Sequence, residues 1–121
     1  MEEVLLSMEL EGLPPTVNHL YRSTAGGRRY KTEAGRQYQQ EVSNIIKQAY
    51  SGTEAYTGSV GLYIVFEVNN RRRWDIDNRV KALQDCLTMA GVLLDDKQVD
   101  MLCVERRHTD CSKTHVTLLK L

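Results

Sequence analysis

The chain has 121 residues, of which 41% are hydrophobic and 26% are charged, ordinary values for one globular domain around one core. No apolar run approaches the roughly 18 residues of a membrane-spanning helix, so we expect no membrane association and a cytoplasmic protein. The formal net charge is zero, which argues mildly against a nucleic-acid partner because phosphate binding draws on basic charge.

The first part of the chain predicts a strand, a loop and a long helix. Residues 4–10, VLLSMEL, have strand character, and GLPP ends the strand. Residues 16–32 contain Gly26-Gly27 and predict a loop or loose hairpin with a mobile, basic tip. Thr32 is expected to cap a helix over residues 33–50. Apolar residues at helical spacing predict its buried stripe: Ala34, Tyr38, Val42, Ile45, Ile46 and Ala49. Its polar side is formed by Gln37, Gln40, Ser43 and Lys47.

The second part predicts a strand, a helix and two further strands. Residues 60–68, VGLYIVFEV, are β-branched and aromatic. A helix is expected over residues 78–90, with Gly91 at its C′ position. Its apolar stripe consists of Val80, Leu83, Leu87 and Ala90. Residues 98–108 and 114–121 predict the last two strands, and the turn TDCSK between them predicts a terminal hairpin.

The predicted order is β-loop-α-β-α-β-β, without a repeat or an interdomain linker. Helices alternate with strands only in the first part of the chain. We therefore expect one small α+β domain over residues 1–121. It should contain a mixed or antiparallel sheet of about four strands with two main helices packed on it.

The cysteines and the N-terminus agree with a cytoplasmic location. Cys86, Cys103 and Cys111 are odd in number and lack CxxC spacing, so neither a disulfide framework nor a zinc site is indicated. We expect reduced thiols, with Cys86 and Cys103 in the core. The acidic start, Met1-Glu2-Glu3, lacks the basic region of a signal peptide.

Basic residues are concentrated in three segments, which are compatible with one basic face on a bipolar molecule. The segments contain Arg22, Arg28, Arg29 and Lys31, then Arg71, Arg72 and Arg73, then Arg106, Arg107 and His108. The arginines at 71–73 could hold phosphates or form a solvated loop. Trp74 could stack on a base or pack against the domain.

Two acidic pairs could form a metal site. Asp75 and Asp77 follow the arginines directly, and residues two apart in an extended segment point the same way. Asp95 and Asp96 can return to them if the chain runs back along the intervening helix. Carboxylate oxygens suit Mg²⁺, which can activate water for phosphodiester hydrolysis, and Lys81 could stabilise charge on the phosphate. The same aspartates could instead be helix caps and turn residues, and Asp77 with Lys81 a surface ion pair.

Four sequence blocks together resemble the RusA-type Holliday junction resolvases, small endodeoxyribonucleases of bacteria and prophages. The blocks are LPPTVNHLYR, RRYKTEAGRQYQQEV, RRRWDIDNRVKALQDCL and AGVLLDDKQV. They come in the family's order and cover most of residues 13–99. The pair DIDN…K and AG…DD.QV at this separation is more specific than a lone acidic motif. Other hydrolytic and nucleotide-binding motifs, such as HExxH and the Walker loop, do not occur in the sequence.

The resemblance implies a magnesium-dependent endonuclease. The D-x-D-N aspartates fall on Asp75 and Asp77, the D-D-x-Q-V catalytic aspartate on Asp96, and the essential lysine on Lys81. In the family the three aspartates bind Mg²⁺, for which Mn²⁺ is a possible substitute. The family's active unit is a homodimer that cuts two opposed strands of a four-way junction by symmetric nicks.

The resemblance also gives candidate DNA contacts, which join the arginines at 71–73. They are Asn18, Arg28, Arg29 and Lys31. Two other functions remain consistent with the residues. One is a non-catalytic DNA-binding module on the same fold, and the other is a metal nuclease that acts on flaps or other branched DNA.

Overall fold

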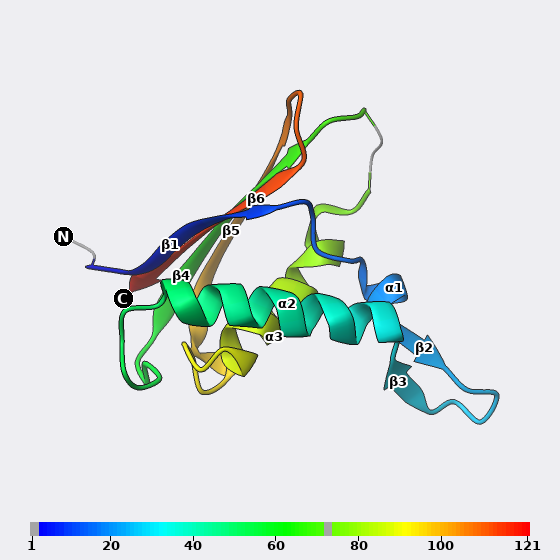
Figure 1. Cartoon of the computed structure of the whole chain (residues 1–121), viewed down its shortest axis with the longest axis horizontal. Helices are drawn as coiled ribbons and strands as arrows, with labels where there is room; N and C mark the ends of the chain where they lie inside the picture. The colour runs from blue at the N-terminus through cyan, green and yellow to red at the C-terminus, as the bar shows by residue number, and fades with distance from the viewer. Residues whose placement is uncertain (1–2, 72–73) are drawn as a thin grey trace.

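The protein is described by a computed structural model over residues 3–71 and 74–121 (Figure 1). The elements in chain order are β1 Glu3–Glu11, α1 Val17–Leu20, β2 Tyr21–Ser23, β3 Arg29–Lys31, α2 Glu33–Ala49, β4 Val60–Val68, the 3₁₀ turn η1 Ile76–Arg79, α3 Val80–Met89, the 3₁₀ turn η2 Asp96–Gln98, β5 Val99–His108 and β6 Lys113–Lys120. The two long helices and the three strands after β3 begin and end within about two residues of the predicted positions.

The main sheet has the strand order β1-β6-β4-β5. β6 pairs antiparallel with β1 and with β4, whereas β4 and β5 run parallel. Parallel neighbours need a crossover connection, and α3 supplies it here. α2 and α3 lie on the same side of the sheet (Figure 1). The α+β class, the mixed four-stranded sheet and the two main helices are confirmed.

The predicted terminal hairpin is wrong. β5 and β6 are neighbours in the chain, but β4 lies between them in the sheet. The burial pattern gives the physical reason. Thr114, Val116 and Leu118 of β6 are buried, so this strand occupies a central position, whereas β5 is mostly exposed and lies at the edge. The residues TDCSK allow the chain to reverse direction, but they do not determine which strand pairs with β6.

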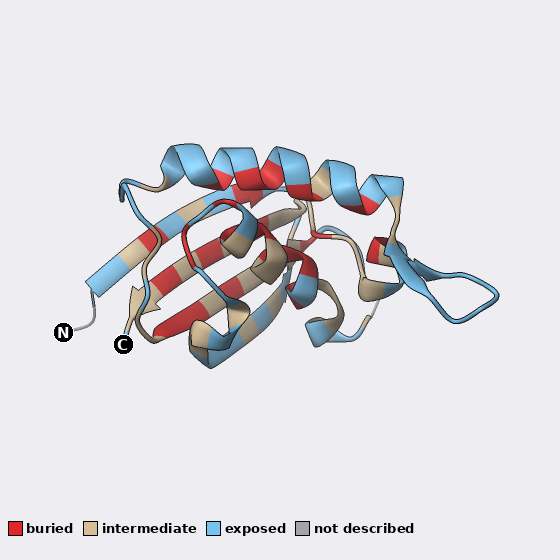
Figure 2. Ribbon diagram, turned by 90° about the horizontal axis from the view of Figure 1, so that it is seen from below, coloured by how far each residue is buried: buried red, intermediate tan, exposed pale blue. Residues whose placement is uncertain are grey.

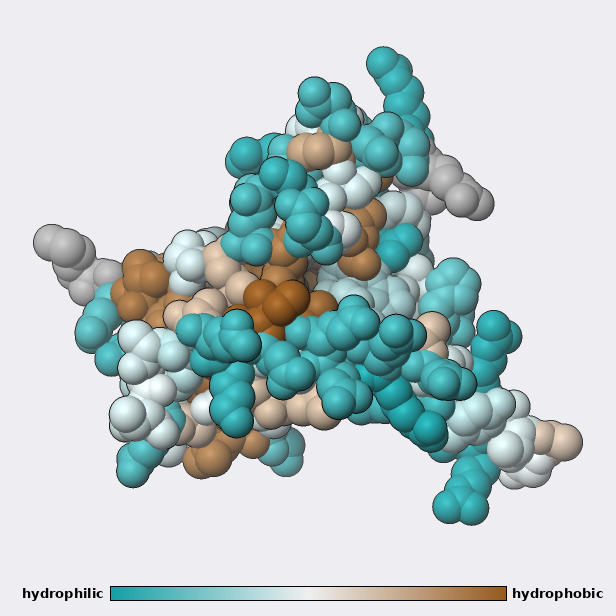
Figure 3. Space-filling view, in the orientation of Figure 1, coloured by the Kyte–Doolittle hydropathy of each residue, from teal (hydrophilic) through white to brown (hydrophobic). Residues whose placement is uncertain are grey.

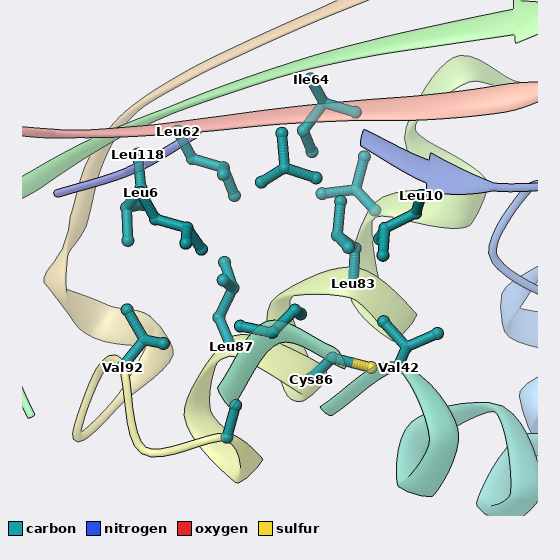
Figure 4. Packing of buried hydrophobic residues seen from close by; sticks show 14 of the residues in the cluster. Leu6, Leu10, Val42, Leu62, Ile64, Leu83, Cys86, Leu87, Val92 and Leu118 are labelled. Carbon is teal, nitrogen blue, oxygen red and sulfur yellow. The ribbon is translucent and has the colours of Figure 1, made fainter. Parts of the chain in front are cut away.

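The core lies between the sheet and the two long helices. Alternate residues of β4 face it, and Figure 2 shows buried and half-buried positions alternating along the central strands. Figure 4 shows Leu83 and Leu87 of α3 directed toward the strands, and Cys86 directed toward Val42 of α2. The strand residues opposite them include Leu6, Leu62, Ile64 and Leu118. The predicted stripe of α3 is confirmed, since Val80, Leu83, Leu87 and Ala90 are all buried.

The buried stripe of α2 differs from the predicted one. Its buried residues are Gly35, Gln39, Val42, Ser43 and Ile46. Ala34, Ile45 and Ala49 are exposed, and Ser43 is not on the polar side. The helix begins against α1, and a Cβ on Gly35 would lie 3.0 Å from the Leu20 carbonyl oxygen. Gln39, a polar residue one turn after Gly35, is buried on the same side of the helix.

The remaining predictions for this part concern the hairpin, the cysteines and the membrane. The loose hairpin is confirmed as β2 paired with β3. Cys86 is buried as predicted, but Cys103 is exposed, because it lies in the edge strand opposite half-exposed Tyr63. Among the described residues, none of the helices has the length and apolarity needed to cross a membrane.

Candidate active site

Asp75 and Asp77 lie on a short exposed turn between β4 and α3. Asp75 is extended (φ −62°, ψ 126°) and precedes the 3₁₀ turn η1, and Asp77 lies in the first turn of η1. The Asp75 side chain makes no capping hydrogen bond, and the residue that precedes α3 is Arg79. The capping explanation therefore does not account for either carboxylate. Both side chains are exposed at the surface.

Trp74 anchors this turn to the domain. Its ring meets Phe66 of β4 edge-on, with the ring centroids 5.6 Å apart. The guanidinium groups of Arg79 and Arg106 lie 4.7 and 5.1 Å from the Trp74 ring centroid. Arg106 also donates a 2.5 Å hydrogen bond to the Trp74 carbonyl oxygen, and Arg79 a 2.6 Å bond to that of Pro14. Trp74 packs against the domain, so its role here is to fix the segment just before Asp75.

The second acidic pair lies in the turn before β5, where its two members have different roles. The Asp95 side chain accepts a 2.8 Å hydrogen bond from the Lys97 amide and forms a capping box with Gln98. Gln98 also donates to the carbonyl oxygens of Tyr56 and Gly58, at 2.7 and 2.9 Å. Asp95 is thus a turn-forming residue. Asp96 is directed instead toward α3.

The acidic turn runs back along α3, the arrangement needed for the two acidic pairs to approach each other. Asp96 Oδ1 accepts a 2.7 Å hydrogen bond from Thr88, and its Oδ2 lies 3.5 Å from Lys81 Nζ. Lys81 is in the first turn of α3, directly after the segment that carries Asp75 and Asp77. Among the ion pairs of the described residues, Lys81 joins Asp96 and Asp85, not Asp77. The surface ion pair suggested for Asp77 and Lys81 is therefore not formed.

A pocket of about 410 Å³ lies beside Asp96, between α2, α3 and the base of the hairpin. Its polar lining includes Tyr21, Lys31, Gln39, Asp85 and Thr88. Asp85 accepts hydrogen bonds from Lys81 at 2.8 Å, Gln39 at 3.2 Å and Tyr21 at 3.4 Å. Lys31 donates a 2.5 Å hydrogen bond to the side-chain amide oxygen of Gln39, Oε1. One connected set of polar side chains therefore links the hairpin to Lys81.

The charges in this pocket shift the pKa values of two of its members. The hydrogen bond from Lys81 to Asp85 is the main cause that raises the Lys81 pKa above its usual value, with partial burial opposing it and Asp96 adding to it. Burial raises the Tyr21 pKa, and the Asp85 charge raises it further. Lys81 is therefore a cation, and Tyr21 a neutral hydrogen-bond donor, at neutral pH.

Comparison with known proteins decides the family. The sequence model of the family described as "Endodeoxyribonuclease RusA" matches residues 11–119, nearly the whole chain. The chain belongs to the RusA endodeoxyribonuclease family. It is 35% identical over 109 residues to the crossover junction endodeoxyribonuclease RusA of Escherichia coli strain K12, with 89% of each chain covered. It is 34% identical over 94 residues to the corresponding protein of Enterobacteria phage HK97, with 77% of this chain and 76% of the relative covered. A third relative, from Enterobacteria phage 82, is 34% identical over 109 residues.

The carboxylates inferred from the RusA family are not gathered at one point in this structure. Among the described residues, the group of three possible ligand atoms within 4.8 Å of one another is Glu9, Glu67 and His115, on the face of the sheet away from the helices. There the 2.6 Å hydrogen bond with His115 lowers the Glu67 pKa, and it already occupies both side chains. Asp75 and Asp77 offer hard oxygen donors without capping partners, and Asp96 offers a third. This donor set fits Mg²⁺ or Mn²⁺, which accept carboxylates and retained waters.

The predicted DNA contacts occupy separate positions around this site. Figure 3 shows mainly hydrophilic side chains over the outer face of α2 and over the projecting hairpin. Asn18, Arg28, Arg29 and Arg71 are exposed. Arg29 lies over the Tyr21 ring, 4.4 Å from its centroid, and Lys31 points into the pocket. Arg72 and Arg73 lie outside the described residues.

Sequence reasoning missed three members of the pocket. Asp85 lies four residues after Lys81, a spacing that alone could have suggested a pair. Gln39 occupies an interior position of α2, where a polar residue needs a partner. Tyr21 carried no signal, because its contact with Asp85 joins residues 64 positions apart in the chain.

Proposed function

We propose that the chain is a magnesium-dependent, structure-selective endodeoxyribonuclease that resolves four-way DNA junctions by paired, symmetric nicks. The observation that carries this proposal is the placement of Lys81 within reach of Asp96, directly after the exposed, uncapped aspartates Asp75 and Asp77. The relatives named as crossover junction endodeoxyribonucleases cover most of the chain and support the choice of substrate.

Asp75, Asp77 and Asp96 are the residues that would hold the metal. Bound there, a hard divalent cation supplies a water of lowered pKa and neutralises charge on the scissile phosphate. Without a cation the carboxylates would repel the DNA phosphates. A bound cation would remove this repulsion, so the carboxylates could lie beside a phosphate. The same role is open to Mn²⁺, because it takes similar oxygen ligands.

Lys81 supplies the fixed positive charge of the site. Its ammonium group lies beside Asp96 and keeps its proton, since its pKa is raised. A cation already in place can stabilise the negative charge that develops on the phosphate oxygens during attack. The Thr88 hydroxyl holds the other oxygen of Asp96, at 2.7 Å, and so limits rotation of this carboxylate.

The hairpin and the arginines at 71–73 are proposed to bind DNA phosphates flanking the cut. Arg28 and Arg29 are exposed on the hairpin, which projects from the end of α2 (Figure 1). Phosphate contacts of this type position DNA without reading its sequence. Asn18, in α1 at the base of the hairpin, is proposed to contact the DNA between the hairpin and the metal site.

We propose a homodimer in the cytoplasm as the active unit, because two symmetric nicks need two sites related by a two-fold axis. The edge strand β5 supports this proposal, since it pairs on one side with β4 and exposes Met101 and Leu102 (42% and 48%). Sedimentation velocity at the concentrations used for cleavage decides the oligomeric state. A monomer under conditions of full activity would contradict the dimer.

A metal titration and a substrate panel test the proposed function. Calorimetric titration with Mg²⁺ or Mn²⁺, in the presence of junction DNA, should show binding that Asp75→Asn abolishes. Cleavage of four-way junctions but not of linear duplex should accompany it. DNA binding without any metal affinity would indicate a non-catalytic module. Equal cleavage of flaps and junctions would indicate a nuclease for branched DNA in general.

A further inference from the structure

Asp85 is a partly buried carboxylate with both oxygens occupied by protein donors. Its side chain is 16% exposed and lies on α3, one turn after Lys81. Lys81 donates to Oδ1, whereas Gln39 and Tyr21 both donate to Oδ2. A carboxylate with three donors is fixed in orientation and has little capacity left for a metal ion. Its role therefore differs from that of the exposed aspartates at 75 and 77.

The side-chain amide of Gln39 can be oriented in only one way between its two partners, because one end of it donates and the other accepts. Lys31 can only donate, so the oxygen of the Gln39 amide must face it, at 2.5 Å. The amide nitrogen of Gln39 then necessarily faces Asp85, which can only accept. Gln39 is 2% exposed, so its side chain is held inside the protein while it bridges the two charged groups. Asp85 is thereby fixed from the side opposite Lys81.

Lys81 needs such a partner because its own position is open. Its side chain is 46% exposed, and a lysine there has many rotamers available. The contact with Asp96 is long, at 3.5 Å, whereas the contact with Asp85 is 2.8 Å. The shorter, charge-assisted hydrogen bond is the stronger one and limits where the ammonium group can lie. That position is beside Asp96.

We propose that Asp85 is a positioning residue that holds the Lys81 ammonium group beside Asp96, and that Gln39 and Tyr21 hold Asp85 in turn. The proposal rests on the proposed function, since it gives Lys81 its place in the cleavage reaction. Asp85 contacts neither the metal nor the DNA. It acts through Lys81 alone, and this restriction makes the role testable.

The kinetic test compares Asp85→Asn, Lys81→Met and the double variant. Asn has the shape of Asp, but its side chain has one acceptor oxygen, whereas the Asp85 carboxylate offers two to the same donors. The single-turnover cleavage rate at saturating enzyme should fall about 10-fold or more in Asp85→Asn, as expected for a misplaced catalytic group. Junction affinity measured in chelator should stay within about twofold of the wild type. In the Lys81→Met background, Asp85→Asn should cause no further loss of rate.

Two controls separate positioning from a change of charge or of folding. Asp110→Asn makes the same charge change on an exposed residue after β5 and should leave the rate unchanged. Gln39→Met keeps the length of the side chain but breaks the bridge, and should lower the rate less than Asp85→Asn does. Gln40→Met, on the exposed side of α2, is its matched control.

A readout independent of cleavage is the NMR signal of the Lys81 ammonium group, assigned by its loss in Lys81→Met. In the metal-free wild type the hydrogen-bonded ammonium should exchange slowly with water, and in Asp85→Asn it should exchange as fast as those of exposed lysines. Equal exchange in both proteins would overturn the proposal. So would a wild-type cleavage rate in Asp85→Asn, or the same loss of rate with and without Lys81. If the wild type cleaves no branched DNA with Mg²⁺, the proposed function fails, and the ammonium exchange still decides whether Asp85 holds Lys81.

Discussion

Burial separates the three thiols of this protein into different chemical classes. Cys86 is fully buried in the core, and this burial raises the pKa of its thiol to about 12. Cys103 is exposed in β5, and Cys111 is half-buried beside Thr109. The thiolate is the reactive form of cysteine, so reactivity should follow exposure and pKa together.

Labelling with a thiol reagent at pH 8 should therefore modify Cys103 rapidly and Cys86 only after denaturation. Because pH 8 is far below the raised pKa of Cys86, its thiol stays protonated as well as inaccessible. Mass spectrometry of the labelled peptides measures both rates. Cys103→Ser should remove the fast phase, and rapid labelling of Cys86 in the native protein would contradict its place in the core.

The Gln98 side chain makes four hydrogen bonds that hold the turn before β5. Its oxygen accepts from the amides of Leu94 and Asp95, at 2.8 and 3.0 Å. Its nitrogen donates to two carbonyl oxygens in the segment before β4. The turn that presents Asp96 is thereby tied to the strand next to β5. Gln98, two residues after Asp96, therefore has a structural role in this turn.

Gln98→Ala should lower the free energy of unfolding by about 2–3 kcal/mol, because four hydrogen bonds are lost at a partly buried position. The cleavage rate should fall as well, since Asp96 loses its support. Denaturant unfolding measures the first effect. Lys97→Ala, an exposed neighbour, should change stability by less than about 0.5 kcal/mol. Equal stability of the two variants would show that the tie is unimportant.

Helices and strands that depend on nearby residues could be predicted from the sequence, whereas features that depend on distant contacts could not. The β4 segment follows from its β-branched and aromatic composition and the α3 segment from periodicity, and every predicted apolar residue of α3 is buried. Ser43 of α2 was placed wrongly on the polar side, and Ala34, Ile45 and Ala49 wrongly on the buried side. The position of β6 between β1 and β4 depends on pairings between residues more than forty positions apart, which periodicity does not encode.

The residues of the candidate site also fall into a group that could be predicted from the sequence and a group that could not. The DIDN and DD motifs could be recognised from sequence, and the resemblance they carry agrees with the family match over residues 11–119. Asp85, Gln39 and Tyr21 come from three different elements and meet only in the folded chain. The sequence therefore predicts the groups proposed for the chemistry better than it predicts the groups that hold them in place.

A net charge of zero is compatible with DNA binding when the charges are separated in space. The hairpin with Arg28 and Arg29 projects from one end of the molecule, and both termini lie at the other end (Figure 1). Acidic residues of β1 are neutralised locally, as in the pairs of Glu3 with Lys120 and of Glu9 with Lys113. The hairpin arginines, which are proposed to contact DNA, have no compensating acid in their own segment, residues 21–31.

Replacing Arg28 and Arg29 together by alanine should weaken junction binding and flatten its salt dependence. Each lost phosphate contact should reduce the slope of log K against log salt by about 0.9. Binding measured by fluorescence anisotropy across a salt series, in chelator, gives this slope. Lys120→Ala removes a positive charge at the other end of the molecule and, as a control, should leave the slope unchanged. An unchanged slope in the hairpin variant would place the DNA elsewhere.

Cleavage of a synthetic four-way junction by the wild type and by Asp77→Asn is the most direct test of the proposed activity. Linear duplex, and chelator in place of Mg²⁺, are the controls. We predict paired nicks in opposed strands that require both Mg²⁺ and Asp77, while Asp77→Asn still binds the junction, as tightly or more tightly because a repulsive charge is lost. Undiminished cleavage by Asp77→Asn, or intact junctions at wild-type concentrations that bind them fully, would contradict this account.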